Sequence, residues 1–262
     1  MKHDNGHGLN RSIRDEVRNI LRKGQQAPSV RVTRDKIAAL PEPVQHYLEY
    51  CNVLGKMTVR TVHLTQTGSF RRGDKWFPLV AEQFFTANPP AFLWHGRIQM
   101  APLLRVTGGD SYHDGIGHLS MKLLSLFKVA DYRGSELDRS ELLRYLLEMS
   151  WFPTAWVSDY LTWDELDNHS AKVTIHDHGI EVSGTLHFND EGQVTRLIAE
   201  RYYGEGHGKF TLKQWTPRVT EYRELNGVRI PTSFEVLWNL ESGEYSYMRA
   251  QITGIEYDSL LS

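Results

Sequence analysis

This sequence has little cysteine, no long apolar run and no excess of one charge. Cys51 is the only cysteine among 262 residues, which excludes an intramolecular disulfide bond and a thiolate metal cluster. No stretch approaches the roughly 18 apolar residues of a membrane-spanning helix, and residues 1–24 lack the apolar core of a secretory signal. We therefore expect a cytoplasmic protein without a transmembrane helix.

Charge and motif content exclude several functional classes. The 30 Lys and Arg residues and 32 Asp and Glu residues give a formal net charge of −2, so the protein has no general basic field that would hold nucleic acid. The signatures of serine hydrolases, phosphate-binding loops, dinucleotide-binding folds and HExxH zinc enzymes are all missing from the sequence. We predict no cofactor and no nucleic-acid partner, while the oligomeric state stays open.

The composition is that of a folded protein rich in aromatic side chains. Hydrophobic residues make up 40% and charged residues 24% of the sequence, far from the composition of disordered chains. The 7 Trp, 12 Tyr and 10 Phe residues suit pleated sheets, concave pockets and interfaces. This content favours a β-rich fold with a substantial core.

Residues 9–22 are expected to form a basic amphipathic helix. Its apolar stripe and the arginines that flank it are Leu9, Ile13, Val17, Ile20 and Leu21, with Arg11, Arg14, Arg18 and Arg22. Such a helix docks on its own protein, on a partner or on an anionic lipid surface. We favour the first because the stripe lacks Trp and Phe. Residues 1–32 are taken as this helix and a linker, and residues 33–262 as one domain.

From Met57 onward the hydrophobic period changes to two, which indicates β-strands. Strand-like runs cover residues 59–70, 76–86, 92–100, 104–112, 118–132, 171–175, 180–188, 194–203, 209–225, 230–240 and 245–257. Short turns, of which Asn226-Gly227 is the strongest hairpin signal, join consecutive runs into an antiparallel meander. Because so many strands do not stay flat, we predict a mainly β, α+β fold: a curved sheet forming a half-barrel or open barrel, or a sandwich.

One convincing helix, at residues 137–150, separates the two β-rich regions. Five apolar residues occupy more than one of its sides: Leu142, Leu143, Leu146, Leu147 and Met149. The helix should therefore be buried, against the concave face of the sheet. Asp138 and Glu141 have the spacing of a capping box at its start. Residues 154–161 are expected to add a helical turn or two.

Several polar residues fall on faces that should be apolar. Burying them there costs free energy unless they are paired or take part in binding or catalysis. With three tryptophans they form the candidate ligand-binding site: Glu82, Trp94, Arg97, Asp110, Tyr112, Arg144, Glu148, Trp151, Arg201 and Trp215. Two interpretations stay open, either structural ion pairs or a cavity whose charged groups hold a polar head or act as acid and base. The sequence His176-Asp177-His178-Gly179 is typical of a turn, and we predict no metal site.

Five short motifs together resemble a bacterial family of unknown function. They are LPEPV at 40–44, AEQFFTA before two prolines at 81–90, LLRYLLE at 142–148, WFPTA at 151–155 and GVRIP at 227–231. The resemblance extends over residues 38–255. It implies a fold similar to the unclosed β-barrel of bacterial lipoprotein carriers and sorting proteins, in which helices plug a hydrophobic concave sheet. Those carriers bind acyl chains, although a shared fold does not transfer a function.

Three functional hypotheses follow from these observations. The leading one is a binding protein for a hydrophobic or amphipathic small molecule, with an acyl, isoprenoid or aromatic ligand inside the half-barrel. The second is an enzyme that uses carboxylates, Arg and Tyr of the same cavity for acid/base chemistry, with no catalytic residue assigned. The third is an interaction module that contacts a protein or a membrane peripherally through residues 9–22.

Overall fold

A long antiparallel sheet dominates the computed structural model, which describes residues 9, 11–102, 104–124, 127–206 and 208–259. Helices α1 (Arg11–Gln25), α2 (Arg34–Ala38) and α3 (Glu42–Tyr50) precede the first group of strands. These strands are β1 (Thr61–Arg72), β2 (Lys75–Thr86), β3 (Ala91–Ala101), β4 (Leu104–His113), β5 (Ile116–Leu123) and β6 (Phe127–Tyr132). Helix α4 (Ser135–Glu148) and two short 3-10 turns, Met149–Trp151 and Pro153–Val157, follow. The remaining strands are β7 (Leu161–Asp167), β8 (Ser170–Asp177), β9 (Ile180–Phe188), β10 (Val194–Gly206), β11 (Lys209–Leu225), β12 (Val228–Leu240) and β13 (Gly243–Tyr257).

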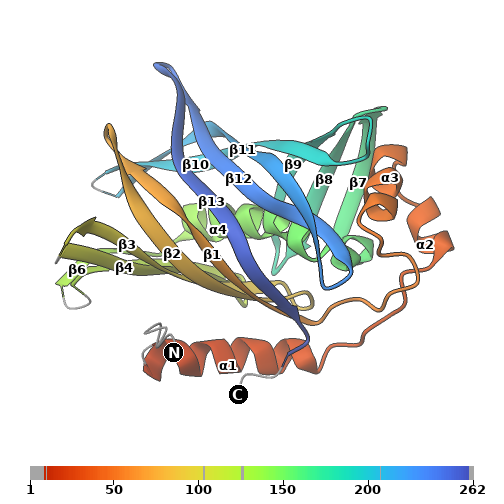
Figure 1. The fold of residues 1–262 in the computed structure, drawn as a ribbon, viewed down its shortest axis with the longest axis horizontal. Coiled ribbons are helices and arrows are strands. Elements are labelled where there is room, and N and C mark those ends of the chain that lie inside the picture. Colours follow the sequence, from red (N-terminus) through yellow and green to blue (C-terminus); the bar gives the residue numbers. More distant parts are fainter. Residues whose placement is uncertain (1–8, 10, 103, 125–126, 207, 260–262) are drawn as a thin grey trace, which may run out of the picture.

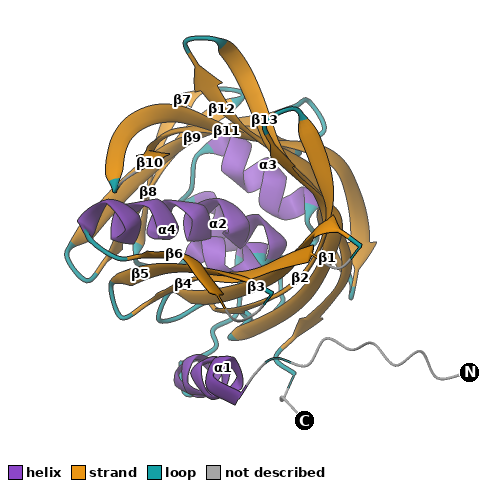
Figure 2. Ribbon diagram, turned by 90° about the vertical axis from the view of Figure 1, so that its left-hand side faces the viewer, coloured by secondary structure: helices purple, strands orange, loops and turns teal. Residues whose placement is uncertain are grey.

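The described strands form one thirteen-stranded sheet that joins two meanders. Its order is β6-β5-β4-β3-β2-β1-β13-β12-β11-β10-β9-β8-β7, so the first and last strands of the chain pair at its centre. The two edges, β6 and β7, are consecutive in sequence and α4 connects them. The sheet curves around α4 and leaves a half-barrel, as Figures 1 and 2 show. The predicted mainly β half-barrel with a central helix is confirmed.

Local sequence explains the hairpins that build this sheet. Asn226 and Gly227 have φ values of 51° and 75° and connect β11 to β12, the conformation that a tight two-residue turn requires. Along β9, Val182, Leu186 and Phe188 are buried toward the interior, while the residues between them are more exposed. Alternation with a period of two therefore fixes which side of each strand faces the core.

Helix α4 occupies the interior of the half-barrel. Leu142, Leu143 and Leu146 are at most 4% exposed, and the hydroxyl of Tyr145 donates to the backbone oxygen of Thr86 at 2.9 Å. The helix lies inside the curve of the sheet (Figure 2). Burial on several sides, rather than along one stripe, matches the spread of its leucines.

The start of α4 differs from the predicted capping box. The residue before the helix, Gly134, has a φ of 130° and makes no side-chain cap. Asp138 instead accepts a hydrogen bond from the backbone nitrogen of Gly117 at 2.7 Å, and Glu141 is buried within the protein. A Cβ at Gly117 would lie 2.7 Å from the backbone oxygen of Leu137. The glycine therefore permits the close approach of β5 to α4.

Helix α1 lies outside the half-barrel, against the convex face of the sheet (Figures 1 and 2). Its apolar stripe packs on β2 and β3 in a cluster made of Val17, Ile20, Leu21, Phe84, Ala91 and Leu93. Arg11, Arg14, Arg18 and Arg22 are exposed. The stripe is thus covered by the protein's own sheet, the first of the three alternatives. Within the described residues, no helix combines the length and the hydrophobicity needed to cross a bilayer.

Two strand predictions were wrong. Residues 118–132 were expected as one run, but they divide between β5 and β6. Leu124, after β5, has a φ of 51°, a turn conformation that leucine rarely adopts and that the sequence does not signal. Strand β7 was missed because it is a sheet edge, where exposure hides the alternation of side chains.

Candidate functional site

A cavity of about 390 Å³ lies between α4 and the inner face of the sheet. Aromatic and aliphatic side chains form most of its wall: Phe70, Trp94, Ile98, Leu119, Met121, Leu147, Trp151, Tyr203, Trp215, Val219, Phe234, Val236, Trp238, Tyr245, Tyr247 and Met248. Its volume falls in the range of about 300–1,000 Å³ typical of small-molecule sites. At the β1–β2 turn, Arg72 and Gly73 border the cavity and are exposed, so this end forms its rim.

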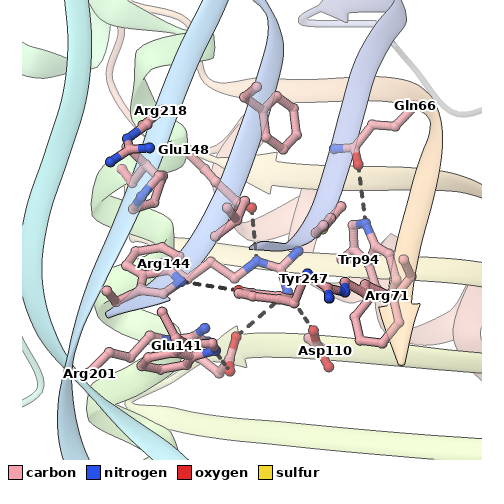
Figure 3. A pocket seen from close by; sticks show the side chains of 18 of the residues that line it. Gln66, Arg71, Trp94, Asp110, Glu141, Arg144, Glu148, Arg201, Arg218 and Tyr247 are labelled. Atoms are coloured by element: carbon pink, nitrogen blue, oxygen red, sulfur yellow. Dashed lines mark hydrogen bonds and ion pairs between the residues drawn. The ribbon is translucent and has the colours of Figure 1, made fainter. Parts of the chain in front are cut away.

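Strand register places three of the polar and aromatic residues of the site side by side. Gln83 on β2 pairs with Trp94 on β3, and Trp94 pairs with Asp110 on β4. Because directly paired residues of neighbouring strands project from the same face, all three point toward α4. Figure 3 shows Trp94 and Asp110 beside Arg144 of the helix.

Arg144 lies at the centre of a group of charged side chains beside α4, which we call the polar floor of the cavity: Asp110, Glu141, Arg144, Glu148 and Arg201. Its Nε donates to Glu148 Oε1 at 2.8 Å, and its Nη1 donates to Asp110. The guanidinium lies over the rings of Phe92 and Trp94, with Cζ 5.0 and 5.4 Å from their centroids. Two carboxylates and two aromatic faces therefore hold this cation inside the protein.

A second guanidinium, that of Arg201 on β10, borders the same floor. Its Nη2 donates to Glu141 Oε1 at 2.9 Å and its Nε donates to the backbone oxygen of Ser140 at 3.2 Å. It stacks on Trp215, whose indole nitrogen donates to the Tyr247 hydroxyl at 3.1 Å. Arg201 thus ties β10 and β11 to the middle of α4.

Two glutamines that the sequence did not indicate complete the network. Gln83 Nε2 donates to Glu148 Oε2 at 2.7 Å, and Gln66 Nε2 donates to Gln83 Oε1 at 3.1 Å. The indole nitrogen of Trp94 donates to Gln66 Oε1 at 3.4 Å. The sequence does contain a pattern that includes them, since each glutamine alternates in step with the apolar residues of the inner face. For Gln83 this pattern was ambiguous because the outer face of β2 is apolar as well.

The floor holds more carboxylates than guanidinium groups: Asp110, Glu141 and Glu148 against Arg144 and Arg201. Burial raises the pKa of Glu141 to about 7, against the opposing effect of Arg201. Burial also raises the pKa of Glu148, although Arg144 counteracts it. Two carboxylate oxygens of this set, Asp110 Oδ1 and Glu141 Oε2, are buried and have no hydrogen-bond partner among the described residues. The floor can therefore accept both protons and hydrogen bonds.

Seven of the ten candidate residues lie around this cavity, and the other three lie elsewhere. The seven are Trp94, Asp110, Arg144, Glu148, Trp151, Arg201 and Trp215. Glu82 and Arg97 face the opposite side of the sheet, where they border a groove beside α1, and Glu82 Oε2 is 3.5 Å from His63 Nε2. Tyr112 is fully buried and donates to Asp177 Oδ2 at 2.6 Å. We therefore leave Glu82, Arg97 and Tyr112 out of the site proposed below.

The face of Glu82 was misassigned for a physical reason. Val80 and Phe84 share its side of β2, and α1 covers that side, so the outer face is as apolar as the inner one. Alternation alone does not distinguish two apolar faces. Glu141, which the sequence placed in a capping box, is brought to Arg201 only by the three-dimensional fold.

The histidine-rich turn at residues 176–179 is engaged in local contacts. His178 Nδ1 lies 2.9 Å from Asp177 Oδ2, and His176 Nδ1 lies 3.4 Å from Glu181 Oε2. His178 has a φ of 45° at the turn between β8 and β9. Among the residues that the structure describes, no three His, Cys, Asp or Glu side chains are grouped so that they could hold a metal ion.

The chain is similar to several known proteins. A DUF1329 family protein from Desulfovibrio piger shares 10% sequence identity with this chain, with 89% of this chain and 96% of that one covered and a TM-score of 0.41. A LolA superfamily protein from Nitrosomonas europaea shares 11% identity, with 83% and 94% covered and a TM-score of 0.37. No curated protein matches the sequence. Residues 30–250 match a family described as being of unknown function, and the chain therefore belongs to that family, DUF6544.

Proposed function

We propose that this protein binds an apolar or amphipathic small molecule in the cavity between α4 and the sheet. The observation that carries the proposal is the cavity itself, which combines a wall rich in aromatic side chains with charged groups on its floor and at its rim. Such a combination is typical of sites that bury most of a ligand and orient it through a few polar contacts. The ligand would lie along the wall with its polar end at the floor.

The floor supports this proposal because its geometry is already set before a ligand enters. Two carboxylates and two aromatic rings fix Arg144, and one carboxylate and one aromatic ring fix Arg201. Their side chains are both 12% exposed. Groups that are held in place lose little freedom when they bind, so less affinity is lost to ordering them. The aromatic wall supplies the apolar contact area, which is the main source of affinity for such ligands.

Filling the cavity tests the proposal with a matched control on the same strand. Val219 lines the cavity, whereas its neighbour Thr220 is exposed on the other side of β11. We expect Val219→Trp to weaken binding of a fluorescent acyl probe by roughly tenfold or more, and Thr220→Trp to leave it nearly unchanged. Equal binding by both variants and the parent protein would place the probe outside the cavity. No binding of acyl or polyprenyl probes by the parent protein would count against the proposal as a whole.

A second candidate function is acid/base catalysis in the same cavity. The pKa of Glu141, raised to about 7 by burial, favours it because a carboxyl group with such a pKa exchanges protons near neutral pH. A bound ligand would then be chemically changed. Mass spectrometry of a co-purified ligand after incubation would reveal a change with the parent protein that Glu141→Gln abolishes, and an unchanged ligand would argue for binding alone.

A further inference from the structure

Two carboxylate oxygens of the polar floor have no hydrogen-bond donor among the described residues. Glu141 Oε2 has no hydrogen-bond partner among the described residues, and the Glu141 side chain is 1% exposed. Arg144 Nη1 lies 3.9 Å from this oxygen, beyond hydrogen-bond distance. Asp110 Oδ1, on the same floor, is likewise buried and unpartnered. Buried acceptors of this kind are rare unless a ligand or water completes them.

Four of the five guanidinium groups that line the cavity have partners, and the fifth, that of Arg72, is exposed at the rim. On the floor, Arg144 donates hydrogen bonds to Asp110 and Glu148, and Arg201 donates to Glu141 and to the backbone oxygen of Ser140. At the rim, Arg71 and Arg218 have partners as well. Arg71 Nε donates to the backbone oxygen of Gly73 at 2.9 Å, and Arg218 Nη1 donates to Glu244 Oε2 at 3.0 Å. An anionic head would compete with the carboxylates that already contact Arg144, Arg201 and Arg218.

Charge on the floor points the same way. Three carboxyl groups face two guanidinium groups there, so a carboxylate or phosphate head would add negative charge where carboxylates are already in excess. An ammonium or hydroxyl head would instead donate hydrogen bonds to Glu141 Oε2 and Asp110 Oδ1. A charged donor would also balance the surplus carboxylate.

Building on the proposed function, we propose that the floor selects ligands whose polar end donates hydrogen bonds, as an aliphatic amine or alcohol does, over carboxylates and phosphates of the same chain length. The shared chemistry is a donor head on an apolar chain. The amine is charged and the alcohol is neutral. A comparison of their affinities therefore separates the effect of hydrogen-bond donation from the effect of balancing the carboxylate charge.

Calorimetry with three ligands of one chain length tests this selectivity on the full chain. Dodecylamine, dodecanol and dodecanoate would be titrated below their micelle-forming concentrations, at about pH 8, where Glu141 is ionised. We expect the amine and the alcohol to bind roughly tenfold or more tightly than the carboxylate, with the amine tightest. If dodecanoate binds as tightly as the other two, the selectivity is refuted while the binding function stands. If none of the three binds, the binding function itself fails.

Substitution of Glu141 by glutamine replaces the free hydrogen-bond acceptor by a donor. With Glu141→Gln, the amide oxygen can keep the hydrogen bond from Arg201, and the amide nitrogen then presents donors where Oε2 was an acceptor. The preference for amine over carboxylate should fall by roughly tenfold or more. Glu200→Gln, at an exposed position of the same β10 strand as Arg201, is the matched control and should keep the preference. Asp110→Asn makes the same change at the other free acceptor, so the test is still available if the Glu141 variant is unstable. An unchanged preference in a folded variant at either position refutes the inference.

Discussion

Replacing Arg144 with methionine should destabilise the protein strongly. The substitution keeps a long side chain between Phe92 and Trp94 but removes the cation that contacts Asp110 and Glu148. Breaking a buried ion pair by removing one partner typically costs about 3–5 kcal/mol, because the remaining charge is left uncompensated. For a chain of this size that corresponds to a fall in Tm of roughly 6–20 °C.

The effect of this substitution should depend on pH in a defined direction. Without Arg144, the pKa of Glu141 and Glu148 should rise further, since that cation opposes the effect of burial on both groups. An acid whose pKa is higher in the folded than in the unfolded state stabilises the fold below its unfolded pKa and loses that contribution as pH rises through the folded pKa. Arg144→Met should therefore be more destabilising at about pH 8 than at about pH 5.

Thermal and urea unfolding followed by circular dichroism measure this prediction. Arg139→Met is a suitable control, because Arg139 is an exposed residue of the same helix whose guanidinium donates to the backbone oxygen of Glu181. It should cost about 1 kcal/mol or less. Adding Asp110→Asn and Glu148→Gln to Arg144→Met should recover much of the loss at high pH. A loss below about 1 kcal/mol for Arg144→Met at about pH 8, or a loss that is larger in acid, would refute the account of the floor as a buried charge cluster.

Three further predictions concern the floor, the thiol and α1. Burial raises the pKa of Glu141 to about 7, so ionisation of this group should lower the free energy of unfolding by about 3 kcal/mol between about pH 4.5 and 7. Glu141→Gln should abolish this contribution. Urea unfolding of both proteins across this pH range measures the difference, and parallel profiles would contradict the prediction. Burial raises the pKa of Cys51, so a thiol reagent should label it only when the protein unfolds, and rapid labelling of native protein would be inconsistent with the fold. Deleting residues 1–27 should uncover Phe84 and Leu93, lower Tm and increase binding of a hydrophobic dye. If the deletion instead abolished binding to anionic liposomes while Tm stayed constant, the third hypothesis, a membrane contact through residues 9–22, would gain support.

The general fold could be predicted because local patterns determine it. A hydrophobic period of two, short turns and a central leucine-rich segment together specify a meander with a buried helix. The same reasoning also predicted the docking of α1, since its stripe has no large aromatic residue. The positions of the sheet edges could not be predicted, because edge strands lack a buried face and β7 shows little alternation.

The site was harder to predict because its members converge from distant parts of the chain. Asp110, Arg144 and Arg201 belong to β4, α4 and β10, and no local pattern states that they meet. Because the outer face of β2 is apolar, Glu82 on that face was predicted to line the cavity, whereas the residue of β2 that joins the network is Gln83. Polar residues on apolar faces were nevertheless a useful signal, since most of the residues chosen on that basis border the cavity.

The most direct test of the central claim is to identify what the purified protein carries. Native mass spectrometry and organic extraction of the parent protein should detect an apolar or amphipathic molecule in addition to the chain. Val219→Trp, which fills the cavity, should carry much less of it, and Thr220→Trp should carry as much as the parent. An empty parent protein that also fails to bind acyl and polyprenyl probes would contradict the proposal that this half-barrel is a ligand-binding cavity.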